Sequence, residues 1–170
     1  MSNFKDVGTF HHKFGLDHVE CQRNIEHDRG VPALPGPRNV SRELIEFRLK
    51  FLLEELREFG EAHGYELGEL HDGSIEFMRN VNHYNLNRGV DHEKSFDSLL
   101  DLAYVVFGTA HVLGYPWQQG WNEVQRANME KERCVKAEDS SRGSTFDVVK
   151  PKGWQPPNIK AVLRAFLFNV

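Results

Sequence analysis

The sequence predicts an all-α fold: a helical bundle whose central helices carry carboxylates and whose core is completed by oligomerisation. Two observations predict it. Apolar residues recur at helical spacing over long stretches, and no two segments show the alternation typical of paired strands. A chain of 170 residues is long enough for one domain with a sizeable core and short for two. We expect a single domain over residues 1–158, followed by a tail or short helix over 159–170.

The first half of the chain is expected to form two helices. One spans about residues 6–15, and a proline-containing irregular stretch follows it up to about residue 40. The second begins at Ser41, a good N-cap, and ends near Gly64. Its apolar face is expected to be buried in the core and consists of Ile45, Leu49, Leu52, Leu53 and Leu56.

In the rest of the chain, the sequence first predicts a turn at residues 72–73 and a short helix at 74–82. A long helix is expected over 92–113. Because its second half is apolar nearly all round, it should lie at the centre of the bundle. A fourth helix is expected over about 116–136, and an extended arm over 148–157.

Composition and charge exclude several classes of protein. The formal net charge is −4, and basic residues are spread along the chain, which argues against binding to a nucleic acid polymer. The longest apolar stretch, 99–113, is interrupted by polar residues and is no membrane span. The two cysteines, Cys21 and Cys134, lack a metal-type spacing and fit a reduced compartment, with one disulfide as the alternative. We therefore expect a soluble cytoplasmic protein.

Five carboxylates on the two central helices are the most informative feature. Glu58 is three residues from Glu55 and four from Glu54, and both spacings place side chains on neighbouring positions of one helix surface. Asp97 and Asp101 are four apart on the next helix, where Asp is a poor helix former. Carboxylates facing one space repel each other, and a hard divalent cation that also binds phosphate is the usual remedy. The pattern predicts a metal-dependent enzyme acting on a phosphate compound.

Each cluster also has a plain structural interpretation. The glutamates would form a solvated face paired with Lys50 and Arg57. Asp97 would be a charge favoured near a helix N-terminus, and Asp101 would be the buried partner of a tyrosine or arginine. Because both clusters occur together, we favour the metal-binding interpretation.

Polar residues near the end of the fourth helix form a third motif. Asn128 and Lys131 share a helix face and offer an amide and an ammonium to phosphate oxygens. The alternative is a polar stretch at a helix C-terminus, where cations are favoured. None of the nine histidines has zinc-type spacing; His12 either lines a pocket or is a plain surface residue.

With these motifs in this order, the chain resembles the MazG-like, all-α nucleoside triphosphate pyrophosphohydrolases of small phage and bacterial type. These belong with the phosphoribosyl-ATP pyrophosphohydrolase-like superfamily. The family's second motif, Glu-x-x-Asp, begins here with Ser98, and Asp97 is expected to supply the missing carboxylate. A long gap before Asp97 implies an insertion at about 65–92. The motifs that carry the resemblance are residues 10–15, 54–58, 97–101, 123–131 and 150–157.

The resemblance implies hydrolysis of a (deoxy)nucleoside triphosphate, for instance a purine such as dGTP, to the monophosphate and pyrophosphate. It implies Mg²⁺ or Mn²⁺ as cofactor, with two or more ions per site. The expected metal ligands are Glu54, Glu55, Glu58, Asp97 and Asp101, with Glu54 and Glu55 as catalytic residues and Glu54 as ligand or general base. The expected phosphate-binding residues are Asn128, Lys131 and Arg126, and further nucleotide contacts are His12, Lys150 and Trp154.

The resemblance also implies a homodimer or homotetramer, and the cytoplasm of the host if the chain is phage-encoded. Two alternatives stay open. One is an all-α metal phosphohydrolase of the His-Asp type, for which His27-Asp28 and His71-Asp72 are the available pairs. The other is a non-catalytic helical interaction module, which would neither bind divalent metal nor turn over nucleotides.

Overall fold

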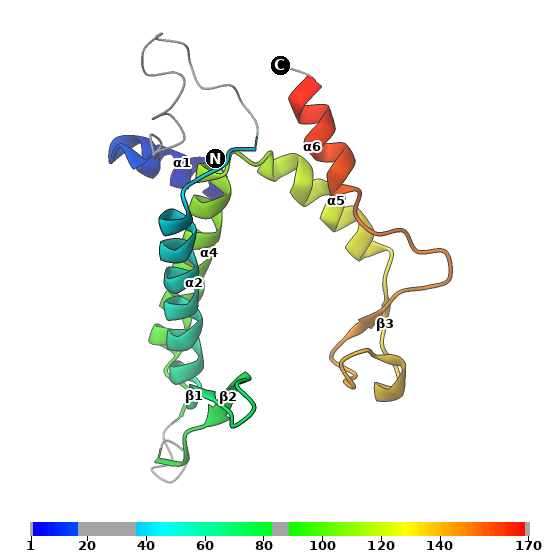
Figure 1. Cartoon of the computed structure of the whole chain (residues 1–170). Coiled ribbons are helices and arrows are strands. Elements are labelled where there is room, and N and C mark those ends of the chain that lie inside the picture. Colours follow the sequence, from blue (N-terminus) through cyan, green and yellow to red (C-terminus); the bar gives the residue numbers. More distant parts are fainter. Residues whose placement is uncertain (1, 17–36, 83–88, 169–170) are drawn as a thin grey trace. The chain divides into compact units, whose positions relative to one another are not determined.

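The computed structural model describes residues 2–16, 37–82 and 89–168, and helices dominate it. Predictions that fall on other residues, such as Cys21 and His27-Asp28, lie outside this range. The all-α prediction is confirmed. The helices are α1 (Asn3–Lys13), α2 (Arg42–Ala62), α4 (His92–Val112), α5 (Trp117–Met129), α6 (Ile159–Phe168) and the short η2 (Ala137–Asp139). The strands are β1 (Tyr65–Glu69), β2 (Ile75–Arg79), β3 (Glu132–Arg133) and β4 (Val148–Val149) (Figure 1).

These elements divide into two compact units. The first contains the elements from α1 to α4, and the second contains those from α5 to α6. The expected single domain over 1–158 stays a prediction. No single described helix is long and apolar enough to cross a membrane, although α4 and α5 taken together have the length and composition for it.

The boundaries of the two long helices follow from their capping residues. The Ser41 hydroxyl accepts a hydrogen bond from the Leu44 amide at 3.2 Å, as predicted, and the Asp91 carboxylate caps α4 by accepting from the Lys94 amide at 3.0 Å. Both helices end before a glycine with positive φ, 78° at Gly64 and 67° at Gly114. The long-helix prediction for 92–113 is therefore confirmed.

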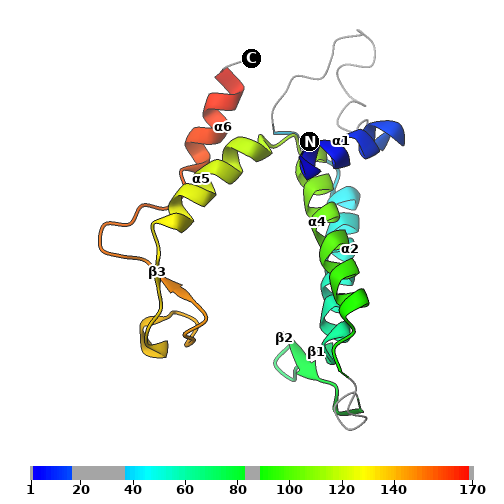
Figure 2. The ribbon, with the colours of Figure 1, turned by 180° about the vertical axis from the view of Figure 1, so that it is seen from behind.

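In the first unit α2 and α4 pack as an antiparallel pair, side by side in both views (Figures 1 and 2). The pair is tied at both ends. The Asp91 amide donates to the Ala62 carbonyl at 3.0 Å, and the Arg38 amide donates to the Leu113 carbonyl at 2.9 Å. Helix α1 packs on α4, so α4 lies between two helices, in agreement with its expected central position.

A close approach at Gly108 lets polar side chains pack against the middle of α4. A Cβ atom at this position would lie 2.7 Å from Nε2 of His11 on α1 and 3.3 Å from Nη1 of Arg48 on α2. A glycine is therefore required where these two side chains meet α4. His11 and Arg48 are both buried there.

The face of α2 that packs inside the unit is not the apolar face predicted from the sequence. Leu49 is 59% exposed, and Leu53 and Leu56 on the same stripe are exposed as well. The buried residues of α2 are Arg48, Glu55, Gly60 and Ala62. The prediction of a buried leucine stripe is wrong for the single chain, because α4 meets α2 through small and polar residues instead.

Residues 65–79 form a hairpin, so the predicted short helix at 74–82 is wrong. Strands β1 and β2 pair antiparallel, with Tyr65 opposite Arg79 and Glu69 opposite Ile75. The turn between them was predicted correctly at 72–73: Asp72 accepts from the Ser74 amide at 2.9 Å, and Gly73 has φ 81°. The two five-residue strands satisfy each other's backbone groups, which a helix broken by this turn would leave unpaired.

In the second unit α5 ends at Met129, seven residues before the predicted end. The chain turns there into β3, which pairs antiparallel with β4. The tail that follows β4 runs back along α5. The Trp154 indole donates to the Ala127 carbonyl at 2.7 Å, and the Asn158 amide donates to the Glu123 carboxylate at 2.9 Å. The extended arm and the final amphipathic helix, α6, are thereby confirmed.

Cys134 lies next to this hairpin and is a free, buried thiol. Its Sγ lies 2.9 Å from the Lys136 carbonyl, to which it donates. The disulfide alternative for this cysteine is not realised.

Glu123 links α5 to the start of α6, and this link should depend on pH. Hydrogen bonds from the Arg126 side chain and the Asn158 amide lower the Glu123 pKa from 4.5 to about 2. The stabilisation is therefore complete above the ordinary pKa and is lost as pH falls toward about 2. We expect Glu123→Gln to lose amide-exchange protection at Asn158 at neutral pH, as wild type does only near pH 2.

Glu130→Gln is the matched control, because Glu130 also binds Arg126, at 2.7 Å, while Asn158 bonds to Glu123. Protection at Asn158 should survive this change. Equal loss of protection in both variants would contradict the proposed link.

Candidate functional site

The five predicted carboxylates gather around Glu55. This residue is 8% exposed on the α4-facing side of α2. Burial raises its pKa most, followed by the negative charges of Asp101, Glu58, Glu54 and Asp97, in that order. The structure therefore brings all five side chains into one electrostatic neighbourhood, from two helices that are far apart in sequence.

No basic side chain of the described residues neutralises this cluster by an ion pair. Arg57, the expected partner on α2, lies 3.4 Å from Glu61 instead, and Lys94 lies 2.8 Å from the same glutamate. Asp101 is exposed, so it is not the buried partner of a tyrosine or arginine. The predicted ion pair of Arg57 and the predicted buried partner of Asp101 are therefore not found among the described residues, whereas the exposure of Glu54 agrees with a solvated face.

Ser98 occupies the position where the resembled family has a glutamate. It is buried, and its hydroxyl donates to the Lys94 carbonyl at 2.8 Å. Asp97, one residue earlier, is exposed and still contributes to the field at Glu55.

A hollow of about 510 Å³ adjoins the cluster, and two of its residues are Glu58 and Asp97. Asp91 and Glu93, which the sequence analysis did not select, line it as well. Asp91 could have been found, since an aspartate before an apolar helical run is an N-cap signal. Lys94 is the basic residue of this lining, and its hydrogen bond to Glu61 raises its pKa. Half of the residues that line the hollow are therefore acidic.

The donor set at this cluster fits a hard cation. All five donors are carboxylate oxygens, which Mg²⁺ and Mn²⁺ prefer. Burial first and the neighbouring negative charges second raise the pKa of Glu55, and a cation would offset both effects. In the conformation shown, no three acidic, histidine or cysteine side chains of the described residues converge closely enough to hold an ion. Metal binding would therefore require side-chain rotation.

Two helical turns from Glu55, on the same face of α2, lies the buried Arg48. Seven residues separate the two, which is about 10 Å along a helix. Burial lowers the pKa of Arg48, and its Nε atom has no hydrogen-bond partner among the described residues. The face of α2 that meets α4 therefore carries one buried anionic and one buried cationic group.

The predicted phosphate-binding residues all belong to the second unit. Asn128 is exposed and Lys131 is half-buried at the end of α5. Arg126 is held by two carboxylates, at 2.8 Å from Glu123 and 2.7 Å from Glu130, which raise its pKa. These ion pairs indicate a structural role for Arg126 within α5.

Of the three predicted nucleotide contacts, two lie in the second unit and one lies on α1. Lys150 and Trp154 lie together, with the lysine ammonium 4.8 Å from the centroid of the tryptophan ring. His12 is exposed on α1, whereas its neighbour His11 is buried. Of the His-Asp pairs, His71-Asp72 lies in the exposed β1–β2 turn, where the Asp72 carboxylate is bonded to Ser74. These hydrogen bonds indicate that His71-Asp72 forms a turn rather than a metal centre.

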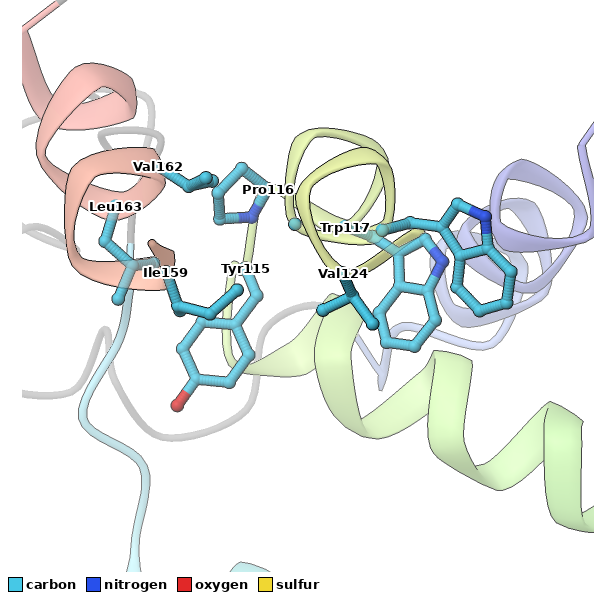
Figure 3. Close-up of a pocket in the computed structure, with 9 residues that line it drawn as sticks. Tyr115, Pro116, Trp117, Val124, Ile159, Val162 and Leu163 are labelled. Atoms are coloured by element: carbon cyan, nitrogen blue, oxygen red, sulfur yellow. The ribbon is translucent and has the colours of Figure 1, made fainter. Parts of the chain in front are cut away.

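The second unit also has an apolar hollow of about 540 Å³ between α5 and α6 (Figure 3). Aromatic side chains of α5 and aliphatic side chains of α6 form most of its wall. The lining residues are Tyr115, Pro116, Trp117, Gly120, Trp121, Val124, Ile159, Val162 and Leu163. The sequence indicated these helices but not a hollow between them.

Residues 30–128 match the family model described as phosphoribosyl-ATP pyrophosphohydrolase. Because the match covers more than half of the chain, the chain belongs to this family, and the resemblance is confirmed. It is therefore a hydrolase of the nucleotide pyrophosphohydrolase class. No curated protein matches the chain. The match includes all five carboxylates and ends at Asn128, so Lys131, Lys150 and Trp154 lie beyond it.

Glu55→Gln is expected to raise the melting temperature at pH 7 in a chelating buffer. The folded-state pKa of Glu55 is raised, so its ionisation opposes folding at higher pH, and this opposition disappears below the ordinary pKa. Removing the charge removes this opposition, so the folded chain becomes more stable at pH 7. The gain should therefore shrink when melting is repeated at about pH 4.

Glu46→Gln on the same helix is the control. Its carboxylate accepts from Arg42 at 2.8 Å and does not contribute to the shift at Glu55. It should not raise the melting temperature. A lower melting temperature for Glu55→Gln at pH 7 would show that the cluster is already compensated.

Proposed function

We propose that the chain hydrolyses a deoxynucleoside triphosphate to the monophosphate and pyrophosphate with the help of Mg²⁺ or Mn²⁺. The observation that carries this proposal is the buried Glu55 with four other carboxylates around it and no ion pair to a described residue. Several carboxylates at one place without an ion pair are typical of a site completed by cations and phosphates. Family membership supports the release of pyrophosphate.

In this proposal the carboxylates bind the metal ions, and one of them accepts a proton from the attacking water. The ions supply charge neutralisation for the phosphates and a more acidic water. Glu54, exposed beside the cluster, accepts the proton of the attacking water as the anhydride bond between the α and β phosphates breaks. The residues that would hold two or more ions are Glu55, Glu58, Asp97 and Asp101, with Glu54 as a further ligand.

Asn128 and Lys131 are the residues of the second unit that we propose to bind phosphate oxygens. Lys131 offers three donors and a full positive charge, and Asn128 offers an amide donor. Arg126 is omitted, because its guanidinium already binds two carboxylates. We further propose a purine substrate such as dGTP, with the exposed His12 as a contact to the nucleotide.

Separate Glu58→Ala and Asp97→Ala variants should each lower the turnover of the preferred substrate about 100-fold, because each removes a metal ligand. The substrate is found by incubating the protein with each common dNTP and NTP plus Mg²⁺ or Mn²⁺. Chromatography should show monophosphate and pyrophosphate as products. The control Glu46→Ala removes an exposed carboxylate of α2 outside the cluster and should retain the wild-type rate.

Wild-type rates in both ligand variants would overturn the site assignment. Release of orthophosphate or intact triphosphate would favour a His-Asp-type phosphohydrolase. No turnover with either metal would favour a non-catalytic module.

We also propose that the chain assembles into a homodimer or homotetramer. The leucine stripe of α2 supports this, and so do exposed apolar residues of α4 such as Phe96, Leu99 and Leu100. An exposed apolar surface of this kind on a two-helix pair is typical of a subunit interface.

Light scattering should therefore give two or four times the chain mass. Leu49→Glu, which places a charge on the leucine stripe, should lower that mass. Val135→Glu changes a residue that is even more exposed, at 80%, but lies in the second unit, and it should leave the mass unchanged. A monomeric wild type would contradict the proposed assembly.

A further inference from the structure

Strand β2 of the first hairpin has one edge bonded to β1, and all five of its residues are exposed. Hydrogen bonds at the two ends of the hairpin show which backbone groups β1 uses. The Leu70 amide donates to the Ser74 carbonyl at 2.7 Å, and the Asn80 amide donates to the Gly64 carbonyl at 2.8 Å. Bonded and non-bonded pairs alternate in an antiparallel ladder. Every second residue from Ser74 to Asn80 therefore bonds to β1.

The residues between these positions form the outer edge of β2. Ile75, Phe77 and Arg79 turn their amide and carbonyl groups away from β1, and no described residue bonds to these groups. A row of open donors and acceptors on one strand is a template for pairing with another strand. Proline, a bulge or lysine commonly blocks such an edge. Strand β2 has none of these, and its two charged residues have opposite signs.

The side chains of β2 add apolar surface beside this edge. Ile75 is 63% exposed, and Phe77 and Met78 are exposed as well. The hairpin lies at the end of the α2–α4 pair (Figure 1), where a Cβ atom at Gly60 of α2 would lie 2.5 Å from Cε1 of Phe77. The ring of Phe77 is therefore anchored on α2. A two-stranded hairpin is marginally stable by itself, so this surface favours the addition of further strands.

The outer edge of β2 is complementary to itself. If two copies pair antiparallel about a twofold axis at Phe77, each Phe77 lies opposite the other, and Ile75 lies opposite Arg79. All the open amides and carbonyls of the two edges then face one another. The phenylalanine rings meet, and Ile75 meets the apolar stem of Arg79. Glu76 lies opposite Met78, so no like charges stand directly opposite.

Neighbouring registers are less favourable. An axis at Arg79 would place two arginines directly opposite each other, which destabilises a strand pair. An axis at Ile75 would bring Phe77 opposite Gly73, in the turn of the hairpin. An axis at Glu76 or Met78 would bring together backbone groups that already bond to β1. The register centred on Phe77 is therefore the one that the edge favours.

We propose that the outer edge of β2 pairs with β2 of a second copy of this chain, which forms a four-stranded antiparallel sheet across a twofold axis. This contact goes beyond the leucine stripe of α2, because it is formed by backbone hydrogen bonds on a different part of the first unit. Two different twofold contacts on one chain generate a tetramer. The β2 contact therefore accounts for the larger of the two proposed assemblies.

Amide hydrogen exchange, resolved by residue, tests the strand pairing directly. In a single hairpin the amides of Glu76 and Met78 are bonded to β1, whereas those of Phe77 and Arg79 are open. In the proposed sheet the Phe77 and Arg79 amides should exchange about tenfold more slowly than in a dilute sample. Dilution should remove this protection and leave that of Glu76 and Met78. Absent protection, or protection unchanged on dilution, would overturn the proposal.

Ile75→Pro removes one outward amide without removing a hydrogen bond between β1 and β2. Proline is tolerated at the first residue of a strand, and circular dichroism should show the wild-type helix content. This variant should halve the mass measured by light scattering and lose the protection at Phe77. Ile75→Ala is the matched control, since it shortens the side chain and keeps the amide, and it should retain both. Equal loss in both variants would assign the contact to the side chain and overturn strand pairing.

Leu49→Glu separates this contact from the leucine stripe. It should leave the protection at Phe77 and Arg79 in place, because the two surfaces are formed by different elements. A mass that falls in Ile75→Pro and not in Leu49→Glu would keep the strand contact and reject the stripe. A mass that falls in Leu49→Glu and not in Ile75→Pro would keep the stripe and overturn the strand contact.

Discussion

The burial of Glu55 between two antiparallel helices is the constraint on which the first unit depends. Burial raises the pKa of this side chain most, and the charges of four other carboxylates raise it further. Helices can meet around such a group only if their contact surfaces are small or polar. Ser98 and Gly108 provide this on α4, and Ser95 provides it through a 2.9 Å hydrogen bond to His63. The packing of α2 on α4 is thus arranged around the charged groups.

On α2 polar residues are buried and apolar residues are exposed, which is the reverse of the usual arrangement. The buried face of α2 carries Arg48 and Glu55, while Leu49 on the outer stripe is 59% exposed. A single chain with this distribution leaves apolar area in water, at a cost of about 25 cal/mol for each Å². That cost is removed only if another surface covers the stripe. The acidic cluster and the proposed assembly are therefore linked, because charged residues occupy the surface where apolar ones would normally pack.

Whether a feature could be predicted from the sequence depended on how far apart along the chain the interacting residues lie. Local signals predicted the cap at Ser41 and the turn at 72–73, because both arise from bonds between near neighbours. The spacing of the carboxylates predicted that those of each helix share one surface, whereas the packing of α2 on α4, which brings the two groups together, is not a local signal. The buried face of α2 was mispredicted, because a leucine stripe does not reveal what covers it. The hairpins were missed for a similar reason: β3 pairs with β4 across a long loop, and two-residue strands leave no periodic pattern.

Each unit holds like charges close together, negative in the first unit and positive in the second. In the first, carboxylates on α2 and α4 are held near one another without a described ion pair; in the second, Lys131 and Lys150 are held by Trp154 in the same condition. Glu55 is buried by packing before any ligand arrives, so the cost of burying its charge belongs to folding rather than to binding. A divalent cation bound at the first set, as we propose, would relieve the repulsion between its carboxylates.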